Sequence, residues 1–214
     1  MKVVPTVFAK NKKDFDSRFK KLIKVSKELQ IDFMDGKFVK SKGVSLKDIP
    51  RLRGKGKFEA HLMVKNPGEW IQDLKKKGFS KVLVHYEAVK DIDNLSRIVF
   101  LIKSEKMKSW LVFNPETDFN RIKEVLSRMD IDGIMFMGVK PGKEGQKLDP
   151  NLIRKVSNVR NFDRKIKIQV DGGINDKNVG NLGKAGVDIV NVGSFVSQAK
   201  DPKKSFELLK KKAA

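Results

Sequence analysis

Short apolar runs, typical of buried β-strands, alternate with segments of helical periodicity along the whole of this 214-residue sequence. This alternation is the pattern of parallel βα units, in which each strand is followed by a helix that covers the sheet. We predict eight strands, over residues 3–8, 29–34, 58–63, 81–86, 109–113, 133–137, 166–170 and 188–192. Predicted helices cover residues 12–27, 67–77, 92–106, 116–128, 150–158, 177–185 and 203–212.

The number of strands decides between two α/β architectures. Eight strands with following helices fit a minimal (β/α)₈ barrel, or TIM barrel, better than an open doubly wound sheet, which typically has about five or six strands. The unit after the second strand, around residues 45–52, is weak and predicts only a turn of helix. We therefore expect residues 1–214 to form a single α/β domain of the TIM-barrel type.

The composition excludes several classes of protein. The sequence has no cysteine, so a disulfide framework and a thiolate metal site are excluded. The apolar run near Met1 is too short for a signal peptide, and no stretch approaches the roughly 20 apolar residues of a membrane span. We expect a cytoplasmic protein with no membrane partner.

The chain is strongly basic, with 47 Lys and Arg residues, 26 Asp and Glu residues, and a formal net charge of +21. Such an excess raises nucleic-acid binding as a hypothesis. The lysines are spread over nearly every predicted helix, as in residues 20–24, 75–77 and 210–212, and do not form one arm or stripe. We interpret them as a solvated surface without a specific nucleic-acid partner, whose positive field helps to collect an anionic substrate.

Polar side chains at strand ends are the candidates for catalysis, because active sites of TIM barrels lie at the carboxyl ends of the strands. Side chains alternate along a strand, so three strands are expected to point polar sets into the barrel mouth. These sets are Gln30, Asp32 and Met34, then Glu59, His61 and Met63, then Lys167, Gln169 and Asp171. Two carboxylates, Asp32 and Asp171, and the His61 imidazole therefore converge from different strands.

Single polar residues near strand ends also have purely structural interpretations. Asp35 before Gly36 is typical of a turn, Asp171 before Gly172 has the same pattern, and a lone histidine is more often a hydrogen-bonded structural residue. The joint position of Asp32, His61 and Asp171 at strand ends nevertheless favours a catalytic site.

Glycines follow three successive strands and provide a second signal. Backbone N–H groups free of side chains lie there, where barrel enzymes hold phosphate, although ordinary tight turns would also use glycine. The residues are Gly142 and Gly145, then Gly172 and Gly173, then Gly193 with Ser194.

Motifs carried by these strand ends resemble those of the ribulose-phosphate 3-epimerase family, in the same order and spacing over nearly the whole chain. The most specific stretches are residues 31–39 (IDFMDGKFV), 60–63 (AHLM) with Asn66-Pro67, 84–88 (VHYEA), Asn114-Pro115, 137–142 (MGVKPG) with Gly145-Gln146, 170–174 (VDGGI) and Gly193-Ser194.

The resemblance implies an isomerase that inverts carbon 3 of a ketopentose phosphate, ribulose 5-phosphate to xylulose 5-phosphate, in carbohydrate metabolism and the pentose phosphate pathway. Asp32 and Asp171 would be the two catalytic aspartates, which act through an enediolate intermediate. The family's divalent metal, commonly zinc, is held by His, Asp, His and Asp, which fall on Gln30, Asp32, His61 and Asp171. Substrate contacts would come from Thr6, His61, Met34, Met63, Met137, Gly142, Lys143, Glu144, Gly145, Gly172, Gly173, Gly193 and Ser194.

The sequence departs from the family's pattern in three places. Gln30 replaces the first metal histidine, which should weaken zinc and favour Mn²⁺ or Mg²⁺. Lys143 and Glu144 replace an aromatic residue and a glycine in the phosphate loop, and Glu144 would be unfavourable beside a phosphate unless Lys143 offsets it or the side chain points away. Lys37 replaces a histidine, without an evident consequence.

The sequence leaves two other functions open. A 3-epimerase of a phosphorylated ketohexose such as allulose 6-phosphate would carry the same aspartates and phosphate loops. A barrel that binds sugar phosphate or nucleic acid without turnover would fit Gln30, Glu144 and the charge, but retention of Asp32, His61 and Asp171 in a desolvated mouth argues against it. The resemblance also suggests a homo-oligomer.

Overall fold

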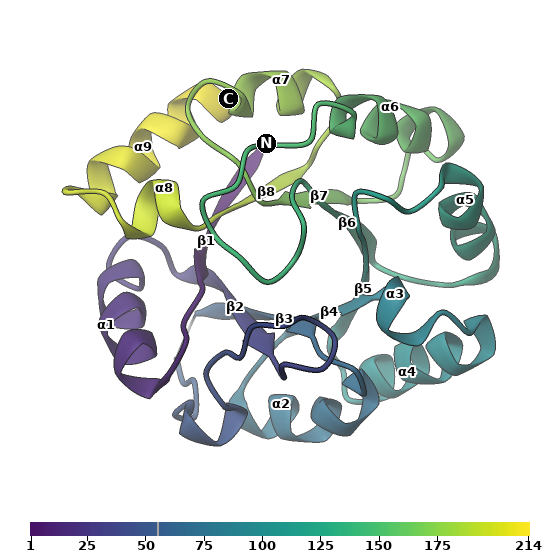
Figure 1. Ribbon diagram of the computed structural model, residues 1–214, viewed down its shortest axis with the longest axis horizontal. Helices are drawn as coiled ribbons and strands as arrows, with labels where there is room; N and C mark the ends of the chain where they lie inside the picture. Colours follow the sequence, from purple (N-terminus) through teal and green to yellow (C-terminus); the bar gives the residue numbers. More distant parts are fainter. Residues whose placement is uncertain (55) are drawn as a thin grey trace.

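Within residues 1–54 and 56–214, which the computed structural model describes, eight parallel strands form a closed barrel (Figure 1). The strands are β1 (Lys2–Val7), β2 (Glu28–Met34), β3 (Lys57–Met63), β4 (Lys81–His85), β5 (Lys108–Phe113), β6 (Gly133–Met137), β7 (Ile168–Asp171) and β8 (Ile189–Val192). Each strand pairs with the next, and β8 pairs with β1 to close the barrel. The predicted TIM barrel and its strands are confirmed.

Helices surround the barrel as an outer ring (Figure 1). They are α1 (Lys12–Leu22), α2 (Ile71–Lys77), α3 (Tyr86–Val89), α4 (Ile92–Ser104), α5 (Phe119–Arg128), α6 (Leu152–Phe162), α7 (Val179–Lys184), α8 (Ser194–Ser197) and α9 (Pro202–Ala213), with short 3₁₀ turns η1 (Leu46–Asp48) and η2 (Pro67–Trp70). The weak unit predicted around residues 45–52 contains only η1. The sequence did not predict the short helices α3 and α8.

Local capping accounts for several helix boundaries. The side chains of Asn11, Asp91, Asp118 and Asp201 accept hydrogen bonds from backbone N–H groups in the first turns of α1, α4, α5 and α9. The helix predicted over 12–27 ends at Leu22, because the chain turns there and the Ser26 hydroxyl binds the backbone of Glu28 before β2 begins.

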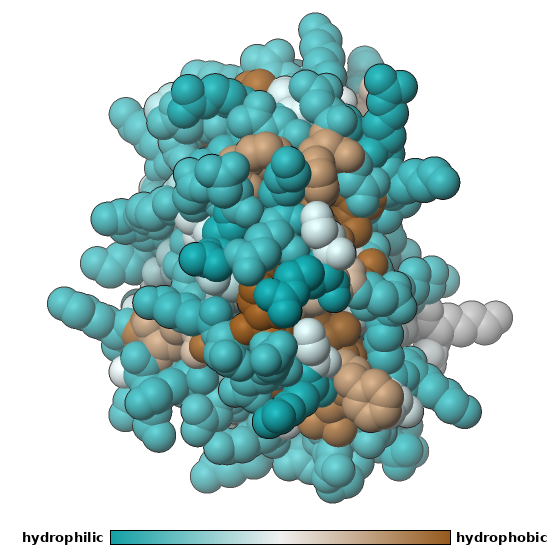
Figure 2. Space-filling view, turned by 90° about the vertical axis from the view of Figure 1, so that its right-hand side faces the viewer, coloured by the Kyte–Doolittle hydropathy of each residue, from teal (hydrophilic) through white to brown (hydrophobic). Residues whose placement is uncertain are grey.

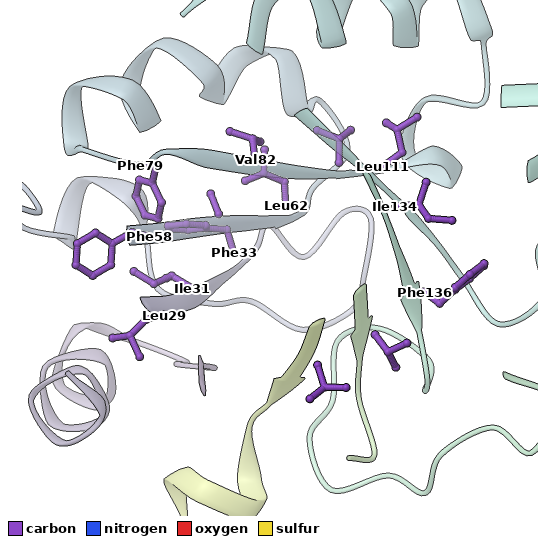
Figure 3. Packing of buried hydrophobic residues seen from close by; sticks show 14 of the residues in the cluster. Leu29, Ile31, Phe33, Phe58, Leu62, Phe79, Val82, Leu111, Ile134 and Phe136 are labelled. Carbon is purple, nitrogen blue, oxygen red and sulfur yellow. The ribbon is translucent and has the colours of Figure 1, made fainter. Parts of the chain in front are cut away.

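The hydrophobic core lies between the barrel and its helices (Figure 3). Leu29, Ile31 and Phe33 of β2 and Phe58 and Leu62 of β3 belong to this buried cluster, as strand alternation predicts. The opposite faces of the same strands carry the buried polar residues Gln30, Asp32, Glu59 and His61. Lys167 was expected to point inward as well, but it precedes β7 and its side chain is 61% exposed, where it pairs with Asp188.

Hydrophilic side chains project over the face that carries α5, with separate apolar groups between them (Figure 2). This distribution agrees with the spread of lysines along the chain. In the part of the chain that the structure describes, every helix is too short or too polar to span a membrane.

Candidate active site

Three polar side chains from three strands meet at the carboxyl-terminal mouth of the barrel. Asp32 on β2 is the register partner of His61 on β3, and Asp171 ends β7. His61 Nδ1 lies 3.1 Å from Asp32 Oδ1 and 3.6 Å from Asp171 Oδ2. All three residues are buried, and one potential ligand atom from each lies within 4.8 Å of the others. The structure thus brings together the residues that strand alternation indicated.

Burial controls the protonation of this group. It raises the pKa of Asp32 to about 8 and the pKa of Asp171 to about 7, and the nearby charge of Asp32 adds to the effect on Asp171. Burial also lowers the pKa of His61 to about 4, so that the imidazole is neutral at pH 7. The two carboxyls therefore titrate near neutral pH when no cation lies between them.

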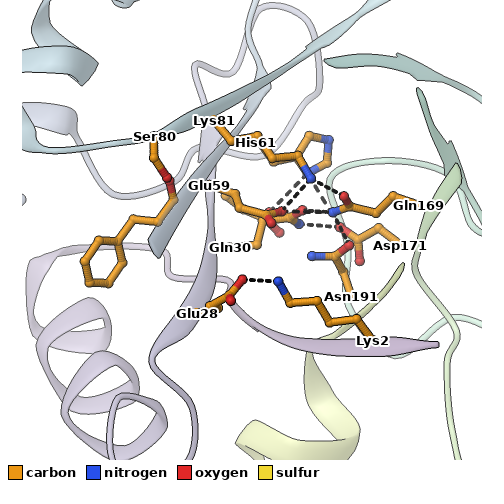
Figure 4. A network of polar contacts seen from close by, with 12 residues as sticks. Lys2, Glu28, Gln30, Glu59, His61, Ser80, Lys81, Gln169, Asp171 and Asn191 are labelled. Atoms are coloured by element: carbon orange, nitrogen blue, oxygen red, sulfur yellow. Dashed lines mark hydrogen bonds and ion pairs between the residues drawn. The ribbon is translucent and has the colours of Figure 1, made fainter. Parts of the chain in front are cut away.

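Gln30 lies one layer deeper in the barrel and contacts both aspartates (Figure 4). Its amide nitrogen Nε2 donates to Asp32 Oδ1 at 3.0 Å and to Asp171 Oδ2 at 2.6 Å. Its Oε1 faces the other way and accepts from Gln169 Nε2 at 3.3 Å. These hydrogen bonds favour the ionised forms of the carboxyls and partly oppose the effect of burial.

A cavity of about 330 Å³ opens onto the buried aspartates. Most of the expected substrate-contacting residues line it, namely Thr6, His61, Met63, Met137, Gly142, Lys143, Glu144, Gly145, Gly172, Gly173, Gly193 and Ser194. Met34 does not line this cavity and is buried against Met63 and Phe8. The Thr6 hydroxyl faces no partner in the described residues, so it remains available to a ligand.

The loop after β6 carries Glu144, whose charge looked unfavourable for a phosphate site. Arg18 on α1 offsets this charge, because its Nη1 lies 2.9 Å from Glu144 Oε2. Arg18 also binds Asp14 one turn earlier on α1, and this second contact fixes the guanidinium. This pair could not be predicted from the sequence, because its members lie 126 positions apart.

Asp35 and Lys37 lie in the loop after β2. Asp35 Oδ1 accepts hydrogen bonds from the backbone N–H groups of Lys37 and Phe38, which confirms Asp35 as a turn residue. The Lys37 side chain is exposed, and nothing in the structure explains the replacement of histidine at this position.

His85, to which the sequence analysis assigned no role, lies behind His61. Its Nε2 lies 2.9 Å from His61 Nε2, and its Nδ1 lies 3.4 Å from Glu87 Oε2. Burial lowers the pKa of His85 to about 4. The alternation of Lys81, Leu83 and His85 along β4 could have identified it as an inward-facing residue.

Asn191 on β8 is a second residue that the sequence analysis missed. Its Oδ1 accepts from Gln169, while its Nδ2 has no partner in the described part of the chain, and the residue lines the cavity. A ligand in the cavity could therefore accept a hydrogen bond from this amide.

Comparison with known proteins identifies the family. The model of the ribulose-phosphate 3-epimerase family matches residues 2–197. The chain belongs to the ribulose-phosphate 3-epimerase family. The ribulose-phosphate 3-epimerase of Candida glabrata is 30% identical over 227 residues, which cover 97% of this chain and 90% of the relative. The Escherichia coli enzyme is 31% identical over 195 residues, which cover 87% and 84%.

Solved structures of other proteins have a fold similar to the barrel of this ribulose-phosphate 3-epimerase family member. The 3-hexulose-6-phosphate synthase from Salmonella typhimurium matches with a TM-score of 0.76 at 19% identity, over 100% of this chain and 98% of the other. The orotidine 5'-phosphate decarboxylase from Pyrococcus horikoshii matches with a TM-score of 0.68 at 17% identity, over 99% and 98%. At these identities the similarity concerns the fold alone.

The donor atoms at the mouth fit a divalent metal, which the ribulose-phosphate 3-epimerase family implies. Asp32, His61 and Asp171 offer two carboxylate oxygens and one imidazole nitrogen at close quarters, a set that Mn²⁺, Mg²⁺ and Zn²⁺ accept. Gln30 presents an amide nitrogen to the same group, and an amide N–H cannot bind a cation. Asp32, His61 and Asp171 are therefore the three side chains that offer ligand atoms to a metal.

Proposed function

We propose that this chain interconverts ribulose 5-phosphate and xylulose 5-phosphate by inverting the configuration at carbon 3. The observation that carries the proposal is the pair of buried carboxyls, Asp32 and Asp171, whose pKa values are raised to about 8 and about 7. Such values allow one carboxyl to act as an acid while the other acts as a base near neutral pH. Membership of the ribulose-phosphate 3-epimerase family supports the same reaction.

The proposed reaction consists of two proton transfers. One carboxylate removes the proton from carbon 3, next to the carbonyl at carbon 2, and leaves an enediolate. The other carboxyl, which begins protonated, returns its proton to the opposite face of carbon 3. Asp32 and Asp171 exchange protonation states in each turnover, so the reverse reaction uses the same two groups in exchanged roles.

Neighbouring residues support these transfers. Neutral His61 and the Gln30 amide hold the orientation of the carboxyls, while Met63 and Met137 exclude water from the reacting carbons. A divalent metal held by Asp32, His61 and Asp171 would supply positive charge to stabilise the enediolate.

The phosphate group of the substrate would bind at the three glycine-bearing loops. The glycines of these loops line the cavity, where their backbone N–H groups would be able to donate to a phosphate, and Lys143 adds a positive side chain. The net charge of +21 favours approach of an anionic sugar phosphate from solution. Family membership also supports a homo-oligomer, which light scattering on the purified protein would measure.

Proton NMR in D₂O tests the proposed function directly. Incubation with ribulose 5-phosphate should produce xylulose 5-phosphate with deuterium at carbon 3, at a rate well above that of a buffer control. Allulose 6-phosphate serves as the matched substrate, and faster exchange with it would identify a ketohexose phosphate as the substrate instead. Absence of exchange at carbon 3 of both sugars, with and without added Mn²⁺ or Zn²⁺, would contradict an epimerase function.

A further inference from the structure

A buried lysine begins a chain of polar contacts that runs beneath the active site (Figure 4). Lys81 on β4 is 6% exposed, and its Nζ lies 3.3 Å from Glu59 Oε2 and 3.5 Å from the centroid of the Trp110 ring. Both contacts stabilise the charged form of the lysine. An ammonium group has no acceptor, so it can only donate hydrogen bonds.

The donor character of Lys81 fixes the orientation of Gln169 on β7. Lys81 Nζ donates to Gln169 Oε1, and the Nε2 of the same amide must therefore face the other way. There it donates to Glu59 Oε2 at 3.0 Å, to Gln30 Oε1 at 3.3 Å and to the Oδ1 of Asn191. Every partner on that side of Gln169 is an acceptor.

The orientation of Gln169 in turn fixes that of Gln30. With Oε1 of Gln30 accepting from Gln169, Nε2 of Gln30 is directed at Asp32 and Asp171. The reverse orientation would place two amide nitrogens against each other at one end. It would also place Gln30 Oε1 against the two carboxyl groups at the other end. The hydrogen-bond chain therefore has a single direction, from Lys81 through Gln169 and Gln30 to the aspartates.

We propose that Gln30 is a positioning residue that donates one hydrogen bond to each aspartate, that Lys81 holds it in this role through Gln169, and that Gln30 is not a metal ligand. The oxygens that it engages, Asp32 Oδ1 and Asp171 Oδ2, are the ones that lie beside His61 Nδ1, where a cation would bind. The amide therefore aligns the aspartates and weakens cation binding at the same point. The inference rests on the proposed function only where it treats the aspartates as catalytic.

A charge-neutral double substitution that reverses this hydrogen-bond direction tests the proposal without any sugar substrate. Glu59→Gln combined with Gln169→Glu moves the carboxylate to position 169 and removes the one that would face it. The new carboxylate accepts from Lys81 and also from Gln30, so the Gln30 amide turns and directs its oxygen at the aspartates. Calorimetric titration of metal-stripped protein with Mn²⁺ should show affinity at least tenfold tighter than in the wild type. The matched control places the same two substitutions in a Gln30→Leu background, where no amide can turn and we expect less than a threefold gain. Equal gains in the two backgrounds, or no gain with Gln30 present, would overturn the proposal.

NMR of the ¹⁵N-labelled wild-type protein gives a second test that does not depend on a variant folding. The side-chain amide protons of Gln30 should show nuclear Overhauser contacts to the ring protons of His61 and slow exchange with solvent. Stronger contacts to the amide protons of Gln169 than to the ring protons of His61 would mean the reverse orientation and would overturn the proposal. Both tests report on amide orientation and metal affinity, so they remain decisive whether or not ribulose 5-phosphate is turned over.

Discussion

Asp32 and Asp171 are the residues on which turnover should depend most. Asparagine keeps the size of each side chain but cannot exchange a proton with carbon 3. We expect Asp32→Asn and Asp171→Asn each to lower kcat by at least about a hundredfold, the low end of general acid–base contributions. Steady-state rates with ribulose 5-phosphate measure the effect, with Asp176→Asn at an exposed ion pair as the control. Full activity in either active-site variant would refute the two-base mechanism.

Burial of Asp32 also links its protonation to stability. The pKa of this carboxyl is raised from 3.8 to about 8, so the folded chain binds a proton between these values that the unfolded chain has lost. The contribution to stability is fully present below about pH 4 and is lost as the pH rises through about 8. Asp32→Asn removes this loss in metal-free protein. The free energy of unfolding of Asp32→Asn, relative to that of the wild type, should therefore be greater at pH 8 than at pH 5. We expect this change to exceed about 1.4 kcal/mol, the equivalent of one pKa unit. Urea unfolding at the two pH values measures this difference, and an unchanged difference would argue against a raised pKa.

Strand alternation was sufficient to predict the positions of Asp32, His61 and Asp171, because the carboxyl ends of all the strands in a barrel meet at one mouth. It could not predict the direction of the Gln30 amide. That direction depends on which atoms of Gln169 and Lys81 face each other, and no periodicity encodes such a pairing. Gln30 therefore looked like a weak metal ligand in the sequence, whereas its hydrogen bonds favour a donor role.

At the scale of elements, the ion pair between Arg18 and Glu144 joins α1 to the loop after β6. Removal of Arg18 leaves an uncompensated carboxylate beside the expected phosphate site, and like charges repel. We expect Arg18→Ala to raise KM for ribulose 5-phosphate about tenfold, equivalent to roughly 1.4 kcal/mol of binding, with a smaller effect on kcat. The double variant with Glu144→Gln should recover most of the loss. Failure of this rescue would mean that Arg18 acts in some other way.

Substitutions at two glycines distinguish the effect of packing between loops from that of backbone strain alone. Both have positive φ, +71° at Gly173 and +78° at Gly145, where a side chain costs about 1–2 kcal/mol. A Cβ at Gly173 would lie 2.6 Å from the backbone N of Leu148, whereas a Cβ at Gly145 meets nothing within 4 Å. Gly173→Ala should therefore displace the loop that carries Leu148, and should lower stability and raise KM more than Gly145→Ala does. Denaturant unfolding and kinetics of the two variants provide the comparison, and equal effects would exclude a role for the close contact between the loops.

The strands were easier to predict than the helix ends and the short helices. A strand inside a barrel is recognised from its own apolar run, while the end of α1 depends on where Ser26 and Glu28 meet. The short helix α8 begins directly after Gly193 and contains only four residues, too few to show a helical period in the sequence. Its position after β8 nevertheless shapes one wall of the cavity through Ser194 and Phe195.

At the scale of the whole molecule, the distribution of the net charge of +21 decides whether it indicates binding to nucleic acid. The lysines are spread along the sequence over nearly every helix and form no single arm or stripe, so we expect only counterion release to drive binding to DNA. We expect binding to duplex DNA to be weak, equal for two unrelated sequences, and lost by about 0.2 M salt. Fluorescence anisotropy across a salt series measures this, and the epimerase assay at the same salt concentrations gives the parallel effect on capture of an anionic sugar phosphate. Tight DNA binding that persists near about 0.2 M salt, and survives Asp32→Asn and Asp171→Asn, would instead indicate a nucleic-acid function on the outer surface.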